Sequence, residues 1–185
     1  MTVAGRTVTA AVRWTHDATL AAVDGLEEPE LTASRGPTAP PVSFHLWHVA
    51  RWADRMAAHL RRELDGTGDP VPEVWVSQGW AQRFGFAHRD LGFGDTGMAL
   101  ADDAWEDLPV PERDVLLGYA RAAFGEANQV IKAAGAETDR PCTDLYGSPG
   151  TIADVLVAHL SHASRHLGMI EALIGLTGRP GSASV

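Results

Sequence analysis

The chain has 185 residues, of which 45% are hydrophobic and 21% charged, the composition of a globular protein with one well-filled core. Its formal net charge of −9, without a clustered basic surface, argues against binding to a nucleic-acid backbone. Its single cysteine, Cys142, excludes an internal disulfide. No segment approaches the roughly 18 apolar residues of a membrane span, and no signal peptide is visible. We therefore expect a cytoplasmic protein that binds neither nucleic acid nor membrane.

The first part of the chain predicts two long helices, at about residues 7–26 and 43–64. A proline-rich segment at 36–41 separates them, because consecutive prolines exclude a helix. Ser43 is the expected N-cap of the second helix. Acidic residues alternate with the arginines of this helix, so we interpret the arginines as a solvated face. They are Arg51, Arg55, Arg61 and Arg62.

The stretch from 70 to 111 is irregular, with a short helix expected near 73–83 and a glycine-rich piece at 92–97. About forty residues between helices is long for a helical bundle. A connection of this length can cross over to a non-adjacent position in the bundle, and such loops often cap a site.

The last part of the chain predicts two more long helices, at about 111–134 and 151–176. Gly135 is a stop signal for the third helix, and Thr151 with Asp154 forms a variant capping box for the fourth. Alternating apolar and polar runs are absent, so we do not expect a sheet. The predicted fold is all-α, a four-helix bundle with a long crossover connection between helices 2 and 3. It forms one domain over residues 1–185, with a core at about 7–176.

Five of the eight histidines lie in the second and fourth predicted helices: His45, His48, His159, His162 and His166. In the fourth helix they continue a stripe that is otherwise apolar and has the three-four spacing of a buried helix face. The expected stripe is Ile152, Val155, His159, His162, His166, Met169, Ile170 and Leu173. Buried imidazoles without partners would cost about 1–3 kcal/mol each, and one divalent ion could satisfy several of them.

His162 and His166 are four residues apart, so their imidazoles can converge on one ion. The glutamate of the zinc-protease motif is replaced by Ala163, which excludes that class of enzyme. His48, on the apolar face of the second helix, is the best third ligand. Three protein ligands with an open position are typical of a catalytic metal. The alternative interpretation is a set of hydrogen-bonded core histidines.

The remaining histidines have other expected places. His45 and His159 precede the proposed ligands by one turn, and we expect them either to hydrogen-bond behind the site or to form ordinary hydrogen bonds of the core. His16, His59 and His88 are expected at the surface.

Two segments resemble the DinB-like superfamily. Residues 45–54, HLWHVARWAD, resemble its H-x-A-x-x-x-D/E element. Residues 162–170, HASRHLGMI, resemble its H-x-x-x-H-x-G-Q-I element, with Met169 where glutamine is common. Residues 80–98 also resemble a subgroup common in actinobacteria. The resemblance extends over about residues 7–176.

The resemblance implies a four-helix bundle with a long crossover and a metal triad of His48, His162 and His166, with zinc or nickel as the ion. Members of the family include thiol transferases that use mycothiol or bacillithiol, a mycothiol-dependent maleylpyruvate isomerase and many proteins of unknown activity. The resemblance therefore implies a small thiol as cosubstrate, bound at the open metal position as the thiolate.

Our first hypothesis is a metal-dependent transferase or isomerase that acts with a mycothiol-type thiol on an electrophilic small molecule. The candidate pocket walls are Trp47, Trp52, Trp80 and Phe84, although core packing is the favoured role for any one of these aromatics. Cys142 follows a proline in a predicted loop and is not expected to be the nucleophile. The alternatives are a metal- or metabolite-binding protein without turnover and a stress-response homodimer whose metal is structural.

Overall fold

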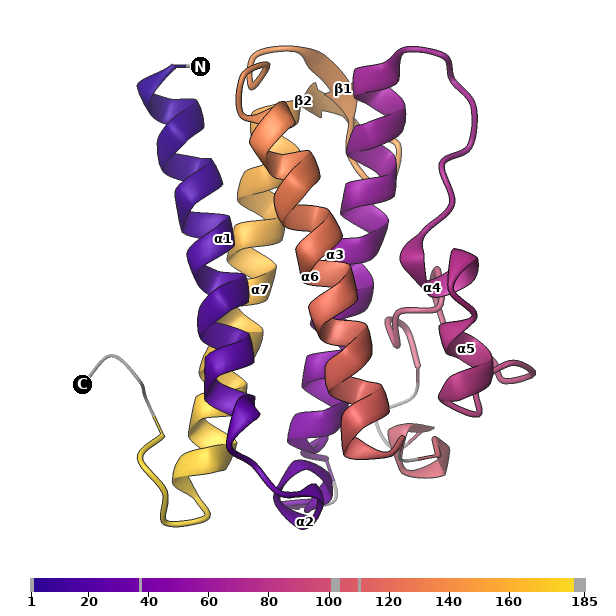
Figure 1. Ribbon diagram of the computed structural model, residues 1–185, viewed down its shortest axis with the longest axis vertical. Helices are drawn as coiled ribbons and strands as arrows, with labels where there is room; N and C mark the ends of the chain where they lie inside the picture. The colour runs from indigo at the N-terminus through magenta and orange to yellow at the C-terminus, as the bar shows by residue number, and fades with distance from the viewer. Residues whose placement is uncertain (1, 37, 101–103, 110, 182–185) are drawn as a thin grey trace.

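A computed structural model describes residues 2–36, 38–100, 104–109 and 111–181. Long helices pack side by side as a bundle (Figure 1). They are α1 (Val3–Asp24), α3 (Val42–Asp65), α6 (Arg113–Ala134) and α7 (Ile152–Gly175). The predicted all-α four-helix bundle is confirmed, and each long helix lies where the sequence placed it, to within a few residues at either end. No helix of the described residues is both long and apolar enough to cross a membrane.

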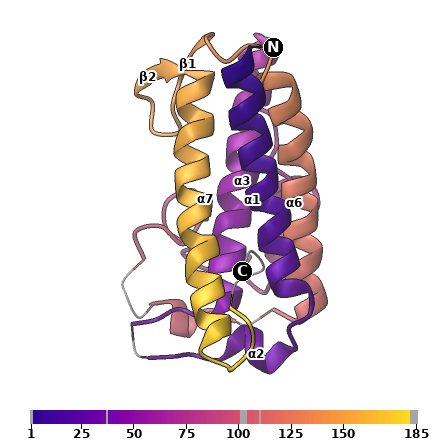
Figure 2. The ribbon, with the colours of Figure 1, turned by 90° about the vertical axis from the view of Figure 1, so that its left-hand side faces the viewer.

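The direction of the helices follows from the long connection. Figure 1 shows α1 and α7 running downward, and α3 and α6 running upward. The pair α1 and α7 and the pair α3 and α6 pack closely, and α3 also packs against α7 (Figure 2). Because α3 and α6 are parallel neighbours, the chain must return along the whole bundle between them. The predicted crossover is therefore confirmed.

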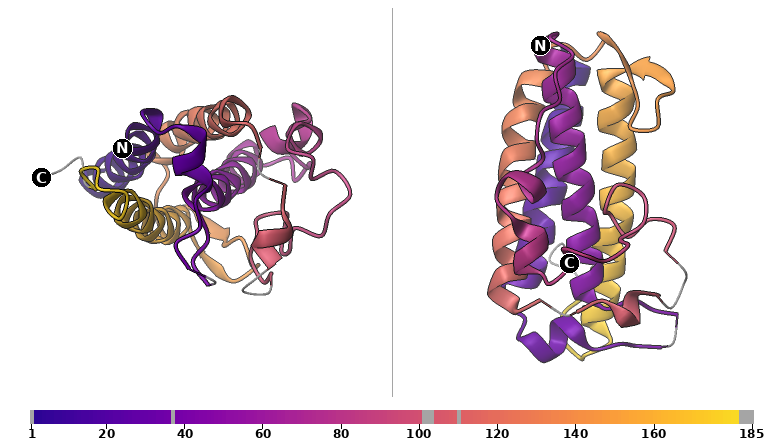
Figure 3. Two further views of the ribbon diagram at one scale, coloured as in Figure 1. Left: turned by 90° about the horizontal axis from the view of Figure 1, so that it is seen from below. Right: turned by 90° about the vertical axis from the view of Figure 1, so that its right-hand side faces the viewer.

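The crossover lies against the outer side of α3 and α6 (Figure 3, right). It contains α4 (Val74–Ser77), α5 (Trp80–Arg83) and the 3-10 helix η1 (Ala104–Asp107). The single short helix predicted here is divided at Gly79, which has a φ of 65° and so interrupts the helical backbone.

Three details differ from the sequence-based expectations. A short helix, α2 (Glu28–Thr32), follows α1 and was not predicted. The helix α3 begins one residue early, with Pro41 rather than Ser43 at the N-cap. A two-stranded antiparallel hairpin, β1 (Pro141–Thr143) and β2 (Pro149–Thr151), joins α6 to α7, so the expectation of no sheet was wrong. Strands of three residues are too short to produce a detectable alternation of apolar and polar side chains.

The ends of α6 and α7 follow the predicted signals. Gly135 is the C-cap of α6. The side chain of Thr151 accepts from the backbone N–H of Asp154, and the Asp154 carboxylate accepts from the backbone N–H of Thr151, so the predicted capping box is confirmed. This box fixes the start of the helix that carries His159, His162 and His166.

The buried face of α7 is rotated from the predicted stripe. Its buried residues are Ile152, Val155, Leu156, His159, Ala163, Leu167, Ile170 and Ile174. Met169, predicted to be in the stripe, is 47% exposed. His162 and His166 are only half-buried and lie at the edge of the buried face, in contact with α3. Because α7 packs against both α1 and α3, its buried surface is broader than one stripe.

Candidate metal centre

The structure brings His48, His162 and His166 together, and we call them the triad. His48 lies on α3, and the other two lie on α7 one turn apart. One ring nitrogen from each residue lies within 4.8 Å of those of the others. The Nε2 of His48 and the Nε2 of His162 are 3.1 Å apart. Residues more than a hundred positions apart in the chain therefore place three imidazoles around one point.

The triad has the dimensions and chemistry of a metal site. Tetrahedral zinc with bonds of about 2.0–2.1 Å to imidazole nitrogen places neighbouring ligand atoms about 3.3 Å apart. The 3.1 Å between His48 and His162 is close to this value. An all-imidazole donor set suits borderline ions such as zinc and nickel and is unsuited to magnesium or calcium. The residues present fit a divalent transition-metal ion.

Contacts behind the triad orient its rings. The Nδ1 of His48 lies 2.5 Å from the carbonyl oxygen of Thr96. A carbonyl can only accept, so this Nδ1 carries the proton and Nε2 keeps its lone pair toward His162. The Nδ1 of His166 lies 3.1 Å from Nδ1 of His45, so His45 lies behind His166. Backing contacts of this kind are usual for metal-binding histidines.

Burial sets the protonation of the triad. It lowers the pKa of His162 to about 4. Burial lowers the pKa of His166 further, to about 2, because a protonated His166 would in addition be repelled by any neighbouring imidazole that becomes protonated. Burial also lowers the pKa of His48, against the opposing effect of the Thr96 hydrogen bond. All three rings are thus neutral at neutral pH, which is the form that coordinates a metal.

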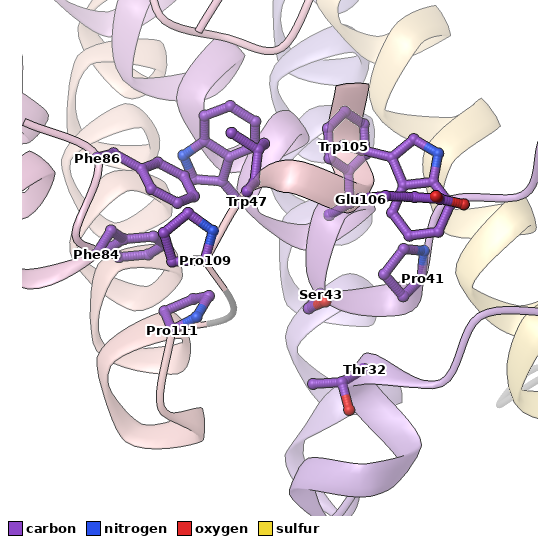
Figure 4. Close-up of a pocket in the computed structure, with 12 residues that line it drawn as sticks. Thr32, Pro41, Ser43, Trp47, Phe84, Phe86, Trp105, Glu106, Pro109 and Pro111 are labelled. Carbon is purple, nitrogen blue, oxygen red and sulfur yellow. The ribbon is translucent and has the colours of Figure 1, made fainter. Parts of the chain in front are cut away.

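A cavity of about 380 Å³ adjoins the triad and is lined by both His48 and His162. Of the predicted pocket aromatics, Trp52 lines this cavity. Trp47 and Phe84 instead line a separate cavity of about 80 Å³ between α3 and the crossover (Figure 4). Trp80 is buried against Tyr119, with ring centroids 5.6 Å apart. The triad therefore faces a space large enough for a small molecule.

The family profile of the DinB superfamily matches residues 11–170. The chain belongs to the DinB superfamily. A crystal structure described as the conserved protein of a locus from Enterococcus faecalis aligns with a TM-score of 0.73 at 18% identity, covering 97% of this chain and 99% of that one. This similarity shows a shared fold. None of the curated proteins matches the chain.

The cavity of this DinB-superfamily protein has walls that sequence patterns did not predict. Tyr146, in the turn between β1 and β2, stacks on Phe93 with ring centroids 5.4 Å apart. Its hydroxyl lies 3.4 Å from the sulfur of Met98. The hairpin turn and the crossover thus meet beside Trp52, which contacts both aromatic rings. The Thr96 carbonyl that accepts from His48 is a backbone group, which no side-chain pattern can identify.

The surface location predicted for two other histidines was wrong. His16 is fully buried, with Nδ1 at 2.9 Å from Oδ1 of Asn128 and Nε2 at 2.8 Å from Nε2 of His159. The sequence held a signal for this, since Val12, His16 and Val23 share one face of α1. His59 is buried against the carbonyl of Thr143, whereas His88 is exposed as expected.

His159 lies three residues before His162 but does not back the triad. Its Nε2 faces His16, and burial lowers its pKa well below 6.5. The ring also forms part of the wall of the large cavity.

The solvated arginine face predicted on α3 was wrong for Arg51, which is 1% exposed. Its guanidinium forms ion pairs with Asp54 and Glu73. Arg55, Arg61 and Arg62 are partly exposed and also pair with carboxylates. We interpreted the alternating charges along α3 as a solvent-exposed face. Part of this alternation instead belongs to a buried network of ion pairs around Arg51.

Proposed function

We propose that this protein is a metal-dependent transferase or isomerase that acts with a low-molecular-weight thiol, of mycothiol type, on an electrophilic small molecule. In this proposal His48, His162 and His166 hold zinc or nickel. The observation that carries the proposal is the convergence of three imidazoles, two of which, those of His48 and His162, line a cavity of about 380 Å³. Three protein ligands leave a position for a further ligand from the cavity side.

The chemistry supplied by the ion fits a thiol. A divalent ion would lower the pKa of a thiol coordinated at its open position, so that the nucleophilic thiolate is available at neutral pH. The thiol must come from outside the chain. Cys142 is buried in β1, and burial together with nearby carboxylates raises its pKa, which makes it a poor nucleophile.

The cavity walls support binding of an apolar electrophile beside the thiol. The aromatic rings of Trp52 and Tyr146 and the side chain of Met98 give the cavity a largely apolar lining. Such a surface excludes water from the thiolate and orients a planar or unsaturated molecule by contact with aromatic rings. Arg165, at the rim and with its charge exposed, adds an attraction for anionic groups on either substrate.

The experiment begins with elemental analysis, which should find about one divalent ion per chain. Cobalt is then substituted and a small thiol is titrated into the protein. A sulfur-to-cobalt charge-transfer band should appear, and 1-chloro-2,4-dinitrobenzene should then lose chloride at a metal-dependent rate as the carbon–sulfur bond forms. Thiol and electrophile binding without turnover would favour a metabolite-binding protein. An ion that never accepts a thiol would favour a structural metal.

A further inference from the structure

The ring of His48 depends on a segment of the crossover that lies far from it in sequence. We call residues 91–98 the 91–98 loop. Its Thr96 carbonyl accepts the Nδ1–H of His48 and so fixes which nitrogen of the ring can face an ion. Whatever holds Thr96 in place therefore also holds His48.

Arg51 is attached to the two residues that precede Thr96. Its Nε donates to the carbonyl of Asp95 at 2.9 Å, and its Nη2 donates to the carbonyl of Gly94 at 3.0 Å. Arg51 follows His48 by three residues on α3, so both side chains leave the same face of the helix. One helix thus holds the ring and also the loop that orients the ring.

The guanidinium is itself held in one orientation by a buried network. Its Nη2 donates to Glu73 at 2.6 Å, and its Nη1 donates to Asp54 and to the hydroxyl of Tyr119, both at 3.2 Å. Asp54 also accepts from the backbone N–H groups of Val74 and Trp75. Every nitrogen of the guanidinium therefore has a hydrogen bond, which is what a buried arginine requires.

The backbone conformation of the 91–98 loop brings it close to α3 and to Arg51. Gly94 and Asp95 have φ values of 57° and 56°, and Gly97 has a φ of 85°. A Cβ at Gly97 would lie 2.8 Å from the ring of Trp47 and 3.0 Å from that of Phe44. The loop is pressed against α3 on one side of Thr96 and bonded to Arg51 on the other.

We propose that Arg51 is a positioning residue for the metal centre. By holding the carbonyls of Gly94 and Asp95, it places the Thr96 carbonyl that sets the tautomer and orientation of His48. The part of this inference that concerns metal affinity rests on the proposed function, whereas the part that concerns the ring does not.

The first test is Arg51→Lys, which keeps a positive charge beside Asp54 and Glu73 but lacks the Nε–H and the fork that hold the loop. The matched control is Tyr119→Phe, which removes a hydroxyl from the same network on the side away from the loop. In metal-free protein labelled with ¹⁵N-histidine, NMR should show the Nδ1–H tautomer of His48 in the wild type and the control. A tautomer mixture should appear in Arg51→Lys. Cobalt affinity should fall by about 10–100-fold in Arg51→Lys and by less than about threefold in the control.

A second variant tests the loop without touching a charge. Gly97→Ala should push the loop away from Trp47 and Phe44 and shift the same His48 signal, with the same loss of cobalt affinity. Gly68→Ala is its control, because Gly68 also has a positive φ, 75°, but has no atom within 4 Å of its Cβ position. The pair therefore separates displacement of the loop from backbone strain, and it remains informative if Arg51→Lys does not fold.

The outcomes separate the two proposals. A wild-type His48 tautomer in both Arg51→Lys and Gly97→Ala would overturn the inference, as would equal effects in the variants and their controls. If the wild type binds no ion at the triad, the proposed function fails. The NMR comparison in metal-free protein would still decide whether Arg51 positions His48.

Discussion

Two groups of histidines share α7 but differ in their surroundings. His159 points toward α1 and forms a pair with His16, whose other nitrogen faces the amide oxygen of Asn128. His162 and His166 lie at the edge toward α3 and join His48 in the triad. Burial lowers the pKa values in both groups. The two groups differ in what lies beside the two facing imidazoles. In the pair it is the side-chain amide of Asn128, and in the triad it is a third imidazole.

This comparison shows that a histidine stripe is not a metal site by itself. The His16–His159 pair can satisfy its facing nitrogens with one proton, donated from one ring to the other, while Asn128 accepts from His16. That arrangement needs no ion. The triad has three ring nitrogens directed at one point and opens to a cavity. The partner helix thus decides which histidines form a core pair and which can hold a metal.

The largest expected effect separates the two groups by metal affinity. His162→Ala removes one of three ligands and should weaken zinc or cobalt binding by more than about 100-fold. This loss of affinity exceeds the loss of about 10–100-fold that is typical when a residue that only hydrogen-bonds to a ligand is replaced. His16→Leu should leave the affinity within a few fold, although it should lower the melting temperature because His159 loses its partner. Competition with a chromophoric chelator measures both. Equal metal retention in the two variants would show that the triad does not hold the ion.

Acid should destabilise the metal-free protein through the His16–His159 pair. Burial lowers the folded-state pKa of His16 to about 4 and that of His159 well below 6.5. Above pH 6.5 both imidazoles are neutral in the folded and in the unfolded protein, so their contribution to the free energy of unfolding does not change with pH. Between pH 6.5 and 4 the unfolded chain binds protons that the folded chain does not, so the free energy of unfolding falls as pH falls. His16 alone contributes a loss on the order of 3 kcal/mol, from about 1.4 kcal/mol per pKa unit.

The measurement is the melting temperature against pH in the presence of a chelator. Replacing both His16 and His159 with leucine should reduce the slope of this dependence. Part of the slope should remain, because burial also lowers the pKa values of His45 and of the triad. Replacing the exposed His88 with alanine should leave the slope unchanged. Because the triad also has lowered pKa values, protons compete weakly for its nitrogens, and bound metal should persist below pH 6.5. An unchanged slope in the double variant would contradict the assignment to the pair.

The smallest expected effect is that of Cys142→Ser. The thiol is buried in β1 and belongs to neither group of histidines, so metal content and thiol-dependent turnover should be unchanged. A stability loss of about 1 kcal/mol is expected from placing a hydroxyl in an apolar position. A variant that keeps its metal and loses activity would indicate that the nucleophilic sulfur belongs to the chain.

The sequence predicted the long helices, the crossover and the three histidines that converge. These features depend on local spacing, such as the four residues between His162 and His166. The two short strands and the buried arginine were missed because neither leaves a periodic signal. Trp47, Trp52 and Phe84 could not be sorted between two cavities, because an aromatic on a buried face reveals nothing about which cavity it borders.

The sequence by itself determined which residues are helical and which faces carry imidazoles, because helix periodicity and capping are properties of neighbouring residues. Only the tertiary structure decided that His16 rather than the triad faces His159, and that the Thr96 carbonyl lies behind His48. The physical reason is that a hydrogen bond to a backbone carbonyl, or between helices more than a hundred residues apart, depends on how the helices and the 91–98 loop pack. Packing is set by the whole core at once.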